Sequence, residues 1–562
     1  MSAQTLEFLA LGGLGEFGKN LTAYRYGEEC IVVDAGMGFP SASQPGVDFV
    51  LPQLGALERF GKVRALIATH GHEDHIGGIP HFLKRFPVPI WGSPYTLKLI
   101  QHRLAETDPD RAHQLNELPL PPQRTAIGPF EVESIRTAHS IPDSRMLLLH
   151  TSLGCIVHSA DFKLDPSPPD GEAVDEARLR EVGREGALLL VSDSTNADRP
   201  GRTPGESSVV EPLDELFSTA TGRIVVTSFA SNVQRVATIA ELSRKHGKRL
   251  ALLGTSVRRH AELAQAMGRL SIAPGVMIHS DRIQGLPKEN CVVIASGSQG
   301  EPRAALHRLA HNAHRDLTLE RGDRLLHSAR SIPGNERSIG NLFNRLLESG
   351  VEVIDSSYSP IHVSGHGASE ELADLIRWVR PAQLFPVHGE YRQQLAHRRV
   401  AVAAGLEDSQ ITIPQNGDRI VLGRDTVERV STMQSGSILI EREGGVVSPE
   451  TVAQRRHAGR DGVISLVVEI NADGSLSNGY PEIAARGFQP ACGVDGELDE
   501  MTDAVQRALR VTFAEWPRGE VRDIATITER VESAVRRAIR STFQRSPLIV
   551  AIVQSLPERR NR

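Results

Sequence analysis

Four side chains that can bind a metal ion occur within six residues of the chain. They are His70, His72, Asp74 and His75 in HGHEDH, at the end of the apolar stretch RALIAT. In an extended segment His70 and His72 project to the same side, because side chains two residues apart share one face of a strand. Asp74 and His75 begin the next turn and can face a second ion. Imidazole and carboxylate ligands without thiolates are typical of zinc or manganese centres rather than of structural zinc fingers. The alternative, a polar loop of solvated histidines, does not explain this density of ligands.

Three further candidate ligands stand at the ends of strand-like segments. His139 ends EVESIRTAH, Asp161 ends CIVHSAD and His388 ends AQLFPVH. Two ions about 3.5–4 Å apart can activate a water molecule and clamp both oxygens of an in-line displacement. His158 is a weaker candidate. Side chains alternate between the two faces of a strand, so if Asp161 points into the site, His158 is expected to have a structural role instead. The expected ligand sets are His70, His72 and His139 for one ion, Asp74, His75 and His388 for the other, and Asp161 as a bridge between them.

A glycine-rich segment near the start of the chain suggests a different chemistry. GLGEFG (residues 13–18) follows the strand-like LEFLAL and matches the G-x-G-x-x-G pattern of dinucleotide-binding folds. That pattern needs a helix opened by the glycines and an acidic residue about 20 positions further on. Asp34 lies at that distance, but it ends a strand and no helical pattern intervenes. We therefore expect the glycines to form a tight turn near the metal site.

Composition limits the classes of protein that the chain can be. The 562 residues are 40% hydrophobic and 23% charged, which is typical of globular chains and suggests about three or four domains. The net charge of −6 gives no overall basic field for nucleic acid, although local basic patches remain possible. The four cysteines show no C-x-x-C spacing, which argues against a disulfide framework or a Cys-based zinc site. With no apolar run of about 18 residues and no basic region before the first apolar stretch, we expect a cytoplasmic protein without membrane spans.

The pattern of elements indicates a discontinuous first domain with an insertion. Short apolar strands that end in Gly, Asp or His dominate the first 200 residues, and from about Gly205 helix and strand periods alternate, as in parallel α/β units. A charged, glycine-rich stretch after this insertion and the returning first domain is typical of a linker. The small domain that follows is expected to contain an amphipathic helix over 524–543 and a buried strand at PLIVAIV. The expected parts are a first domain at 1–205 and 361–430, an inserted α/β domain at 206–360, a linker at 431–460 and a C-terminal α/β domain at 461–556.

The motif H-x-H-x-D-H resembles the signature of the metallo-β-lactamase superfamily, and the match is complete. His72 at the second position favours a hydrolase, because the oxygen-reducing diiron branch has Glu there. Asp193 in VSDSTNA, His366 in HVSGHGAS and His388 in FPVHGE resemble motifs A, B and C of the β-CASP nucleases. This resemblance implies an α/β fold, a metallo-β-lactamase αββα sandwich interrupted by an inserted β-CASP domain.

Further motifs narrow the resemblance to the bacterial ribonuclease J family. They are GGLGEFGKN, HSIPDS, DSTNADRPGRTPGESS, SFASNVQRV, SGSQGEP, IPGNE and the C-terminal ARGF, spread over residues 5 to 555. The family's metal ligands carry over to the same seven residues reached above from spacing. One departure is visible. The family's common Thr-Gly before the bridging aspartate is Ser159-Ala160 here, a mild change that could shift the loop.

The resemblance implies a metal-dependent nuclease that cuts single-stranded RNA as a 5′→3′ exonuclease and as an endonuclease, in rRNA processing and mRNA decay. It implies two divalent metal ions per subunit, zinc first and manganese as the alternative. Asp74 would orient the attacking hydroxide, and His366 would stabilise charge or protonate the leaving 3′ oxygen, with Asp193 orienting it. It also implies a preference for 5′-monophosphate ends, a homodimer or homotetramer, and partners in RNA decay or on the ribosome.

RNA-binding residues are expected in two loops. Ser364, Gly365, His366 and Gly367 resemble a phosphate cradle, because small residues let the backbone present N–H donors. Ser231 and Asn232 could receive a 5′ phosphate or terminal nucleotide, or they could cap the helix of VQRVATIAEL, and both roles are compatible.

Two other functions are weighed against this one. A small-molecule thioester or lactam hydrolase of the same fold would not explain the inserted domain or the SGHGAS and VHGE motifs. A non-catalytic scaffold subunit of an RNA-processing assembly would be expected to have lost ligands, and all seven are present.

Overall fold

The structure is a computed structural model that divides into two compact units. It describes residues 5–41, 43–109, 113–171, 173–332, 334–424, 426–441, 444–471, 474–477, 481–488, 497–516 and 523–555. The first unit comprises Met1–Phe39 and Val50–Ile438, and the second comprises Pro40–Phe49 and Leu439–Arg562. The chain passes from one unit to the other between Phe39 and Pro40, within β5 (Phe49–Pro52) and within β23 (Ser437–Ile440). Cys492 and the terminal PERRNR lie outside the described residues.

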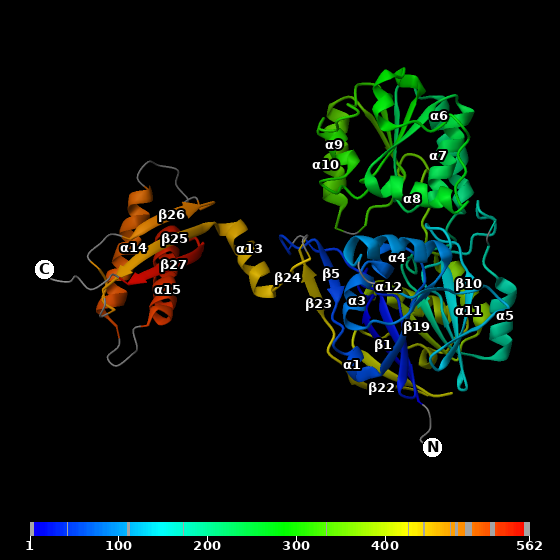
Figure 1. Ribbon diagram of the computed structural model, residues 1–562, viewed down its shortest axis with the longest axis horizontal. Helices are drawn as coiled ribbons and strands as arrows, with labels where there is room; N and C mark the ends of the chain where they lie inside the picture. Colours follow the sequence, from blue (N-terminus) through cyan, green and yellow to red (C-terminus); the bar gives the residue numbers. More distant parts are fainter. Residues whose placement is uncertain are drawn as a thin grey trace. The chain divides into compact units, whose positions relative to one another are not determined.

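Two sheets form the centre of the first unit (Figure 1). The larger has the order β22 (Val427–Thr432), β21 (Asp418–Leu422), β1 (Leu6–Gly12), β3 (Leu21–Tyr26), β4 (Glu29–Val33), β6 (Lys62–Ala68), β7 (Ile90–Gly92) and β8 (Leu115–Glu117). The smaller has the order β19 (Gln383–Val387), β13 (Ala187–Asp193), β12 (Gly154–His158), β11 (Arg145–Thr151), β10 (Phe130–Arg136) and β9 (Thr125–Ile127). β11 and β12 pair as an antiparallel hairpin.

A continuous apolar core lies between the two sheets. It includes Phe8, Tyr24 and Ile67 from the larger sheet and Leu149 and Phe385 from the smaller one. The rings of Phe8 and Phe385 meet edge to face, 5.2 Å between centroids. Each fully buried side chain of this size stabilises the fold by roughly 1.5–3 kcal/mol, so this core fixes one sheet against the other.

Helices cover the outer face of each sheet, which completes the αββα sandwich expected from the sequence. The larger sheet packs against α1 (Leu57–Phe60), α3 (Ile79–Arg85) and α4 (Pro94–Thr107). The smaller sheet packs against α5 (Glu176–Glu185), α11 (Ser369–Val379) and α12 (Tyr391–Ala403), with η4 (Asp408–Gln410) following. The short α2 (Glu73–Ile76) and the two-residue strands β2 (Leu14–Gly15) and β20 (Gly389–Glu390) lie at the candidate site.

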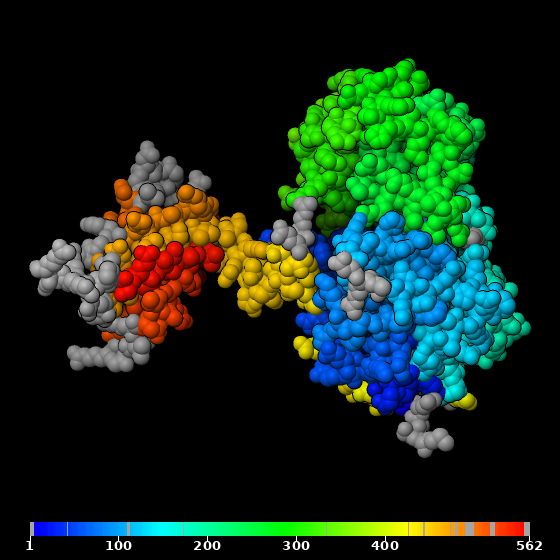
Figure 2. Space-filling model, in the orientation of Figure 1, coloured from blue at the N-terminus to red at the C-terminus, as the bar shows by residue number. Residues whose placement is uncertain are grey.

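The inserted segment is a parallel α/β body, seen as the green lobe of Figures 1 and 2. Its sheet has the order β15 (Arg249–Leu253), β16 (Cys291–Ala295), β14 (Ile224–Thr227), β17 (Arg324–His327) and β18 (Glu352–Asp355). Runs such as CVVIA are buried along their whole length, as parallel strands covered on both faces require. The helices are η1 (Glu206–Val209), α6 (Val210–Ser218), α7 (Val233–Lys245), α8 (Thr255–Ala266), η2 (Ser280–Gly285), η3 (Lys288–Asn290), α9 (Ala305–Ala310) and α10 (Glu336–Glu348).

One buried arginine joins the two points at which the chain enters and leaves this inserted body. Arg235 of α7 is 1% exposed, and its guanidinium donates to the Glu206 carboxylate at 2.8 Å and 3.0 Å. It also donates to the carbonyl oxygen of Ile361 at 2.8 Å. Removing one partner of such a buried ion pair typically costs about 3–5 kcal/mol, so Arg235 fixes the inserted body to both crossing segments.

The second unit contains β24 (Val446–Val447), α13 (Pro449–Asp461), α14 (Glu497–Ala514) and α15 (Ile524–Phe543), with a sheet in the order β26 (Glu482–Arg486), β25 (Val463–Ile470) and β27 (Leu548–Ser555). α15 is the predicted amphipathic helix, and its Ile527, Val531, Val535 and Ile539 pack against the sheet. Among the described residues no helix is both long and apolar enough to cross a bilayer.

Two expectations for this end of the chain need correction. Residues 431–460 are not a plain linker, because they include β24 and most of α13, which Ser448 caps by accepting from the Thr451 N–H at 3.1 Å. The PLIVAIV strand is buried on one face only, since Val550 and Ile552 of β27 are 39% and 49% exposed. The apolar run therefore does not mean a strand covered on both sides.

Candidate metal centre

The seven predicted ligands come together where strands of the two sheets end. His70 follows β6, His139 follows β10, Asp161 follows β12 and His388 follows β19. Asp74 and His75 lie in α2, immediately after His72. The ligand atoms form overlapping groups in which all atoms lie within 4.8 Å of one another. Strand ends at one edge of the sandwich thus place residues up to 318 positions apart at a single point.

The first group consists of three histidines and one carboxylate. His72 Nδ1 lies 3.2 Å from His70 Nε2 and 3.0 Å from His139 Nε2. The Oδ2 atom of Asp161 lies 3.6 Å from His70 Nε2 and 3.7 Å from His139 Nε2. His139 is fixed from behind, because its Nδ1 donates to the carbonyl oxygen of Gly365 at 2.7 Å. Its Nε2 then carries no proton and directs its lone pair toward the group.

The second group shares Asp161 with the first. Asp74 Oδ2 lies 3.3 Å from His388 Nε2 and 3.6 Å from His75 Nε2. Asp161 Oδ2, which also faces the first group, lies 3.3 Å from His75 Nε2, and Asp161 Oδ1 lies 3.5 Å from His388 Nε2. Asn20 also reaches this group, with its Nδ2 3.1 Å from His75 Nε2. The arrangement matches the sets expected from spacing, with Asp161 between them.

The residues present fit divalent metal ions. Asp161 is 2% exposed, and among the described residues its Oδ1 has no hydrogen-bond donor. Burial lowers the pKa of His72 to about 4, so this ring is neutral at pH 7 and its lone pair is free. Burial opposes ionisation of Asp161, but the surrounding His388 and His75 outweigh it and hold the pKa of the carboxyl well below its usual range. The Asp161 carboxylate and the neutral His72 imidazole are donors that suit a cation site. The nearby carboxylates outweigh burial and raise the pKa of His75 and of His388 well above the usual value, so a metal ion bound there would displace protons from these two rings.

Two residues outside the predicted set orient the ligands. Asp34 accepts from His75 Nδ1 at 2.8 Å and also from the backbone N–H of Thr69 at 2.8 Å. Thr195 Oγ1 lies 2.8 Å from His388 Nδ1. Such partners fix the tautomer and direction of a ligating ring. Sequence reasoning considered Asp34 only for a dinucleotide site, although its place at a strand end was the same signal that identified the ligands.

The glycine-rich segment 13–18 forms the expected turn beside the site, and the dinucleotide interpretation is not supported. Gly13, Gly15 and Gly18 have φ of 83°, 71° and 84°, values that favour glycine. β2 pairs in parallel with β20, and the N–H of His388 donates to the carbonyl oxygen of Gly13 at 3.0 Å. The turn therefore positions His388, and the chain continues into β3 instead of a helix.

Asp193 and His366 form a pair at the edge of the ligand groups. His366 Nδ1 lies 2.7 Å from Asp193 Oδ2, and His366 Nε2 lies 4.0 Å from Asp161 Oδ2. Burial lowers the pKa of His366, but the Asp193 and Asp161 carboxylates outweigh it and raise the pKa above the usual value. The ring therefore holds a proton more readily than an isolated histidine. Asp193 also lies 3.4 Å from His388 Nδ1, so it joins this pair to the second ligand group.

The predicted phosphate cradle is held by Asn196, a residue that sequence reasoning missed. The Asn196 amide donates to Ser364 Oγ and to the carbonyl oxygen of His366, both at 2.9 Å. Its own oxygen accepts from the guanidinium of Arg330 at 3.0 Å. A Cβ on Gly365 would lie 2.7 Å from the His139 ring, so only glycine fits there. Asn196 belongs to the DSTNA motif, but the motif does not indicate which distant residues its side chain contacts.

The inserted body contributes Ser231, whose Oγ lies 3.0 Å from His72 Nε2. Asn232 caps α7, because its side-chain oxygen accepts from the Arg235 N–H at 3.0 Å. His158 stays outside the ligand groups and pairs with the Tyr24 hydroxyl at 2.8 Å. The structure therefore brings Ser231 to the ligands and gives Asn232 the capping role.

The loop before Asp161 has a left-handed backbone conformation at Ala160, the position where the family commonly has glycine. Ala160 has φ of 49°, in the left-handed region. A non-glycine residue there costs roughly 1–2 kcal/mol. The N–H of Ser159 nevertheless donates to Val191 at 2.9 Å, and Asp161 is in place between the two ligand groups. The Ser159-Ala160 pair is accommodated without displacing the ligand.

Comparison with known proteins agrees with this geometry. Family models match the metallo-β-lactamase superfamily at residues 14–173, the ribonuclease J β-CASP domain at 221–346, the Zn-dependent metallo-hydrolase RNA specificity domain at 352–413 and the ribonuclease J C-terminal domain at 450–556. The chain is 36% identical to ribonuclease J of Synechocystis sp., over 98% of this chain and 87% of that one. It is 34% identical to ribonuclease J of Thermus thermophilus, over 98% and 95%, and 34% identical to that of Sinorhizobium meliloti, over 98% and 97%.

A crystallised protein of unknown function from Enterococcus faecalis shares the fold. It covers 74% of this chain and 100% of its own, with a TM-score of 0.52 and 16% identity. At this identity the likeness concerns the fold alone.

Proposed function

Since this chain belongs to the ribonuclease J family, we propose that it degrades single-stranded RNA by two routes, 5′→3′ exonucleolytic removal of nucleotides and endonucleolytic cleavage. It is a metal-dependent hydrolytic ribonuclease, and RNA is its substrate. The observation that carries the proposal is Asp161, a buried carboxylate shared by two ligand groups beside a histidine–aspartate pair and a backbone cradle.

We propose that the site holds two divalent ions, zinc first and manganese as the alternative. The ligands are His70, His72 and His139 for one ion, Asp74, His75 and His388 for the other, and Asp161 for both. When bound, such ions lower the pKa of a water molecule and neutralise charge on a scissile phosphate. Histidine and carboxylate ligands accept either metal.

His366 is the proposed acid. Its Nδ1 is held by Asp193, so its Nε2 projects toward Asp161, where a scissile phosphate would lie. A proton on Nε2 can stabilise charge on the phosphate or pass to the leaving 3′ oxygen. Asp193 keeps the ring in this orientation, and Asp74 is the residue proposed to orient the attacking oxygen.

The phosphate cradle is proposed to receive the 5′ end. Asn196 keeps residues 364–367 in place. The N–H groups of His366 and Gly367 already donate, to Ser364 Oγ at 3.1 Å and to the carbonyl oxygen of Phe162 at 2.7 Å. The donors proposed for the phosphate are therefore the Ser364 hydroxyl and the N–H groups of Ser364 and Gly365. Ser231 closes the other side, next to His72. A cradle of fixed N–H donors fits one phosphate and has no room for two more.

RNA that carries a 5′ monophosphate is expected to be degraded exonucleolytically at least about tenfold faster than the same RNA with a 5′ triphosphate, the ratio that corresponds to about 1.4 kcal/mol. Release of mononucleotides from matched labelled RNAs measures it. Ser231→Ala should bring the rates on the monophosphate and triphosphate RNAs closer together. Ser207 is an exposed serine of the same inserted body, and Ser207→Ala should leave the ratio of the two rates unchanged. Equal rates on both RNAs would remove the 5′-end pocket from the proposal.

The remaining expectations are also proposals. The first domain would comprise residues 1–205 and 361–430, the insertion 206–360 and the C-terminal domain 461–556. The protein would act in the cytoplasm on rRNA and mRNA as a homodimer or homotetramer, with RNA-decay or ribosome-associated partners. The exposed Val550 and Ile552 of β27 support an assembly role for the C-terminal domain, because apolar surface of this kind is covered when subunits associate.

A chain that ends at Ile438 is expected to keep its metal ions and to lose the oligomer, with lower activity on long RNA. The seven ligands all lie in the first unit, so their geometry does not depend on the removed residues. Sedimentation velocity and elemental analysis of the same sample test both parts. A truncated chain that sediments with an unchanged subunit number would refute the assembly role.

A further inference from the structure

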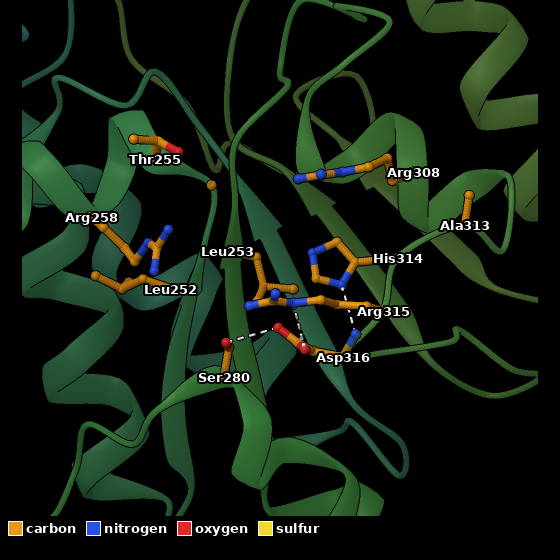
Figure 3. Close-up of a pocket in the computed structure, with 11 residues that line it drawn as sticks. Leu252, Leu253, Thr255, Arg258, Ser280, Arg308, Ala313, His314, Arg315 and Asp316 are labelled. Atoms are coloured by element: carbon orange, nitrogen blue, oxygen red, sulfur yellow. Dashed lines mark hydrogen bonds and ion pairs between the residues drawn. The ribbon is translucent and has the colours of Figure 1, made fainter.

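The inserted body contains a cavity of about 300 Å³ that the metal centre does not use (Figure 3). It lies outside the carboxyl end of β15, at the first turn of α8, and is closed by α9 and the segment that follows it. In parallel α/β sheets, ligands bind in crevices outside the carboxyl ends of the strands. The position is therefore the one at which such a fold accommodates a ligand.

Three arginines from three different segments converge on this cavity, as Figure 3 shows. Arg258 comes from α8, Arg308 from α9 and Arg315 from the segment after α9. Across the described residues neither Arg258 nor Arg308 has an acidic partner. Arg315 pairs with Asp316 at 3.1 Å. Cationic side chains that converge without matching carboxylates are the arrangement that binds phosphate.

The other titratable groups of the cavity leave this positive charge in place. Asp316 is the acid among the lining residues, and it also accepts from Ser280 Oγ at 2.9 Å. His314 accepts the Asp316 N–H through Nδ1 at 3.2 Å, and burial together with Arg308 lowers the pKa of this ring. With three arginines against one carboxylate, the cavity carries a net charge of about +2 at neutral pH.

Backbone donors add to the arginines. α8 has 12 residues and begins at Thr255, with Gly254 in the N-cap position, and no described side chain caps it. Gly254 has φ of 117°, and a Cβ there would meet Ser296 Oγ at 2.1 Å, so glycine is required for this approach. The free N–H groups of the first turn and the positive end of the helix both favour an anion.

A second cavity of about 470 Å³ adjoins the first and shares Gly254, Thr255 and Arg308 with it. Its lining includes Phe229, Glu301 and Arg303 together with small polar residues from the ends of β14 and β16. Glu301 and Arg303 have opposite charges, so they leave the net charge of about +2 unchanged. The aromatic ring offers a surface for a base, while Arg258 and Arg315 line the first cavity and Arg308 lines both. Together the two cavities have the size and polarity of a site for one nucleotide.

We propose that these joined cavities bind a ribonucleoside 5′-phosphate, with the phosphate on Arg258, Arg308 and Arg315 and the nucleoside toward Phe229. The site is separate from the metal centre and does not depend on its chemistry. The nucleotide would be either free in solution or one unit of a bound RNA strand, and both sources present the same phosphate and base.

Binding of 5′-AMP to the full-length, metal-loaded protein tests this site. Equilibrium dialysis should find two classes of AMP sites, one at the phosphate cradle and one at these joined cavities, and the cavity class should persist in His366→Ala. Arg258→Gln and Arg308→Gln should each weaken that class about tenfold, the effect of losing one charge-assisted hydrogen bond, and the double variant about 100-fold. Adenosine should bind far more weakly than AMP, and higher salt should weaken AMP binding. Arg321→Gln is the matched control, because Arg321 precedes β17 and so belongs to the amino edge of the same sheet.

Steady-state hydrolysis distinguishes the two sources of the nucleotide. If the site takes a unit of RNA, the double variant should raise KM for a 20-nucleotide RNA without changing KM for a dinucleotide. If it takes a free nucleotide, only AMP binding should change. The proposal is overturned if the double variant binds AMP with the affinity and stoichiometry of the Arg321→Gln control.

Discussion

Asp161→Asn should lower kcat/KM for RNA by about 10⁴-fold or more, because one change removes a ligand from both ions. Asparagine keeps the size of the side chain, so the fold should persist. The amide is neutral, however, and places N–H donors against imidazole nitrogens that must remain free. Elemental analysis of the same preparation should show less than one bound ion per chain. The test combines that metal content with the rate on a 5′-monophosphate RNA.

Asp281→Asn provides the control for this substitution. Asp281 is an exposed carboxylate of η2 that pairs with His279 at 2.9 Å, so its loss should alter neither metal content nor rate. An Asp161→Asn protein that retains two ions and most of its activity would show that the shared carboxylate does not hold them.

His366→Ala is expected to keep both metal ions and to lose about 10²–10⁴-fold in rate, the usual contribution of a general acid–base group. Asp193→Asn should resemble it, because Asp193 Oδ2 holds the His366 ring at 2.7 Å. The double variant should then cost little more than either single one, because the two residues act as one unit. His388→Ala should instead lose metal as well as rate.

These variants are best compared in one series of rate and metal measurements. Metal loss in His366→Ala together with full occupancy in His388→Ala would reverse the two assignments. Fully additive losses in the His366→Ala/Asp193→Asn variant would show that Asp193 does not act through His366. Asp193 also lies 3.4 Å from His388 Nδ1, so the effect of Asp193→Asn could arise through either histidine. The double-mutant cycle separates these two routes.

The ligand groups could be predicted from the sequence because each ligand stands next to a recognisable element. A strand must end where its apolar run ends, and the ends of neighbouring strands meet at one edge of a sheet. This places His70, Asp161 and His388 together although the chain between the first and last spans hundreds of residues. The inserted parallel sheet follows from the alternating helix and strand periods, whereas the αββα sandwich was implied by the family resemblance.

The residues that orient the ligands could not be predicted in this way. Asn196 and Thr195 act through loop contacts with Ser364 and His388, and such contacts depend on how loops pack rather than on any periodic pattern. The arginine-lined cavity is a similar case, because Arg258, Arg308 and Arg315 come from separate segments without a common motif. Residue spacing therefore predicted the residues that the structure groups together, but not the side chains that support them.

The sequence of helix α13 contains a helix-start signal, but its weak apolar periodicity outweighed that signal in the prediction. Its charged, glycine-containing sequence has little apolar periodicity, which favoured a linker. Ser448 followed by Pro449 is nevertheless a typical helix start, with a capping hydroxyl and a proline in the first turn. The end signals of a helix can identify it where its apolar face is weak.

Metal titration of the chelated protein is the most direct test of the metal-dependent ribonuclease centre. Zn²⁺ or Mn²⁺ is added back in steps to metal-free protein, and bound ions and RNA hydrolysis are measured on each sample. We expect no hydrolysis in excess chelator and a rate that rises until two ions are bound per chain. Full hydrolysis in excess chelator, with no metal detected by elemental analysis, would contradict a metal-dependent mechanism at this site.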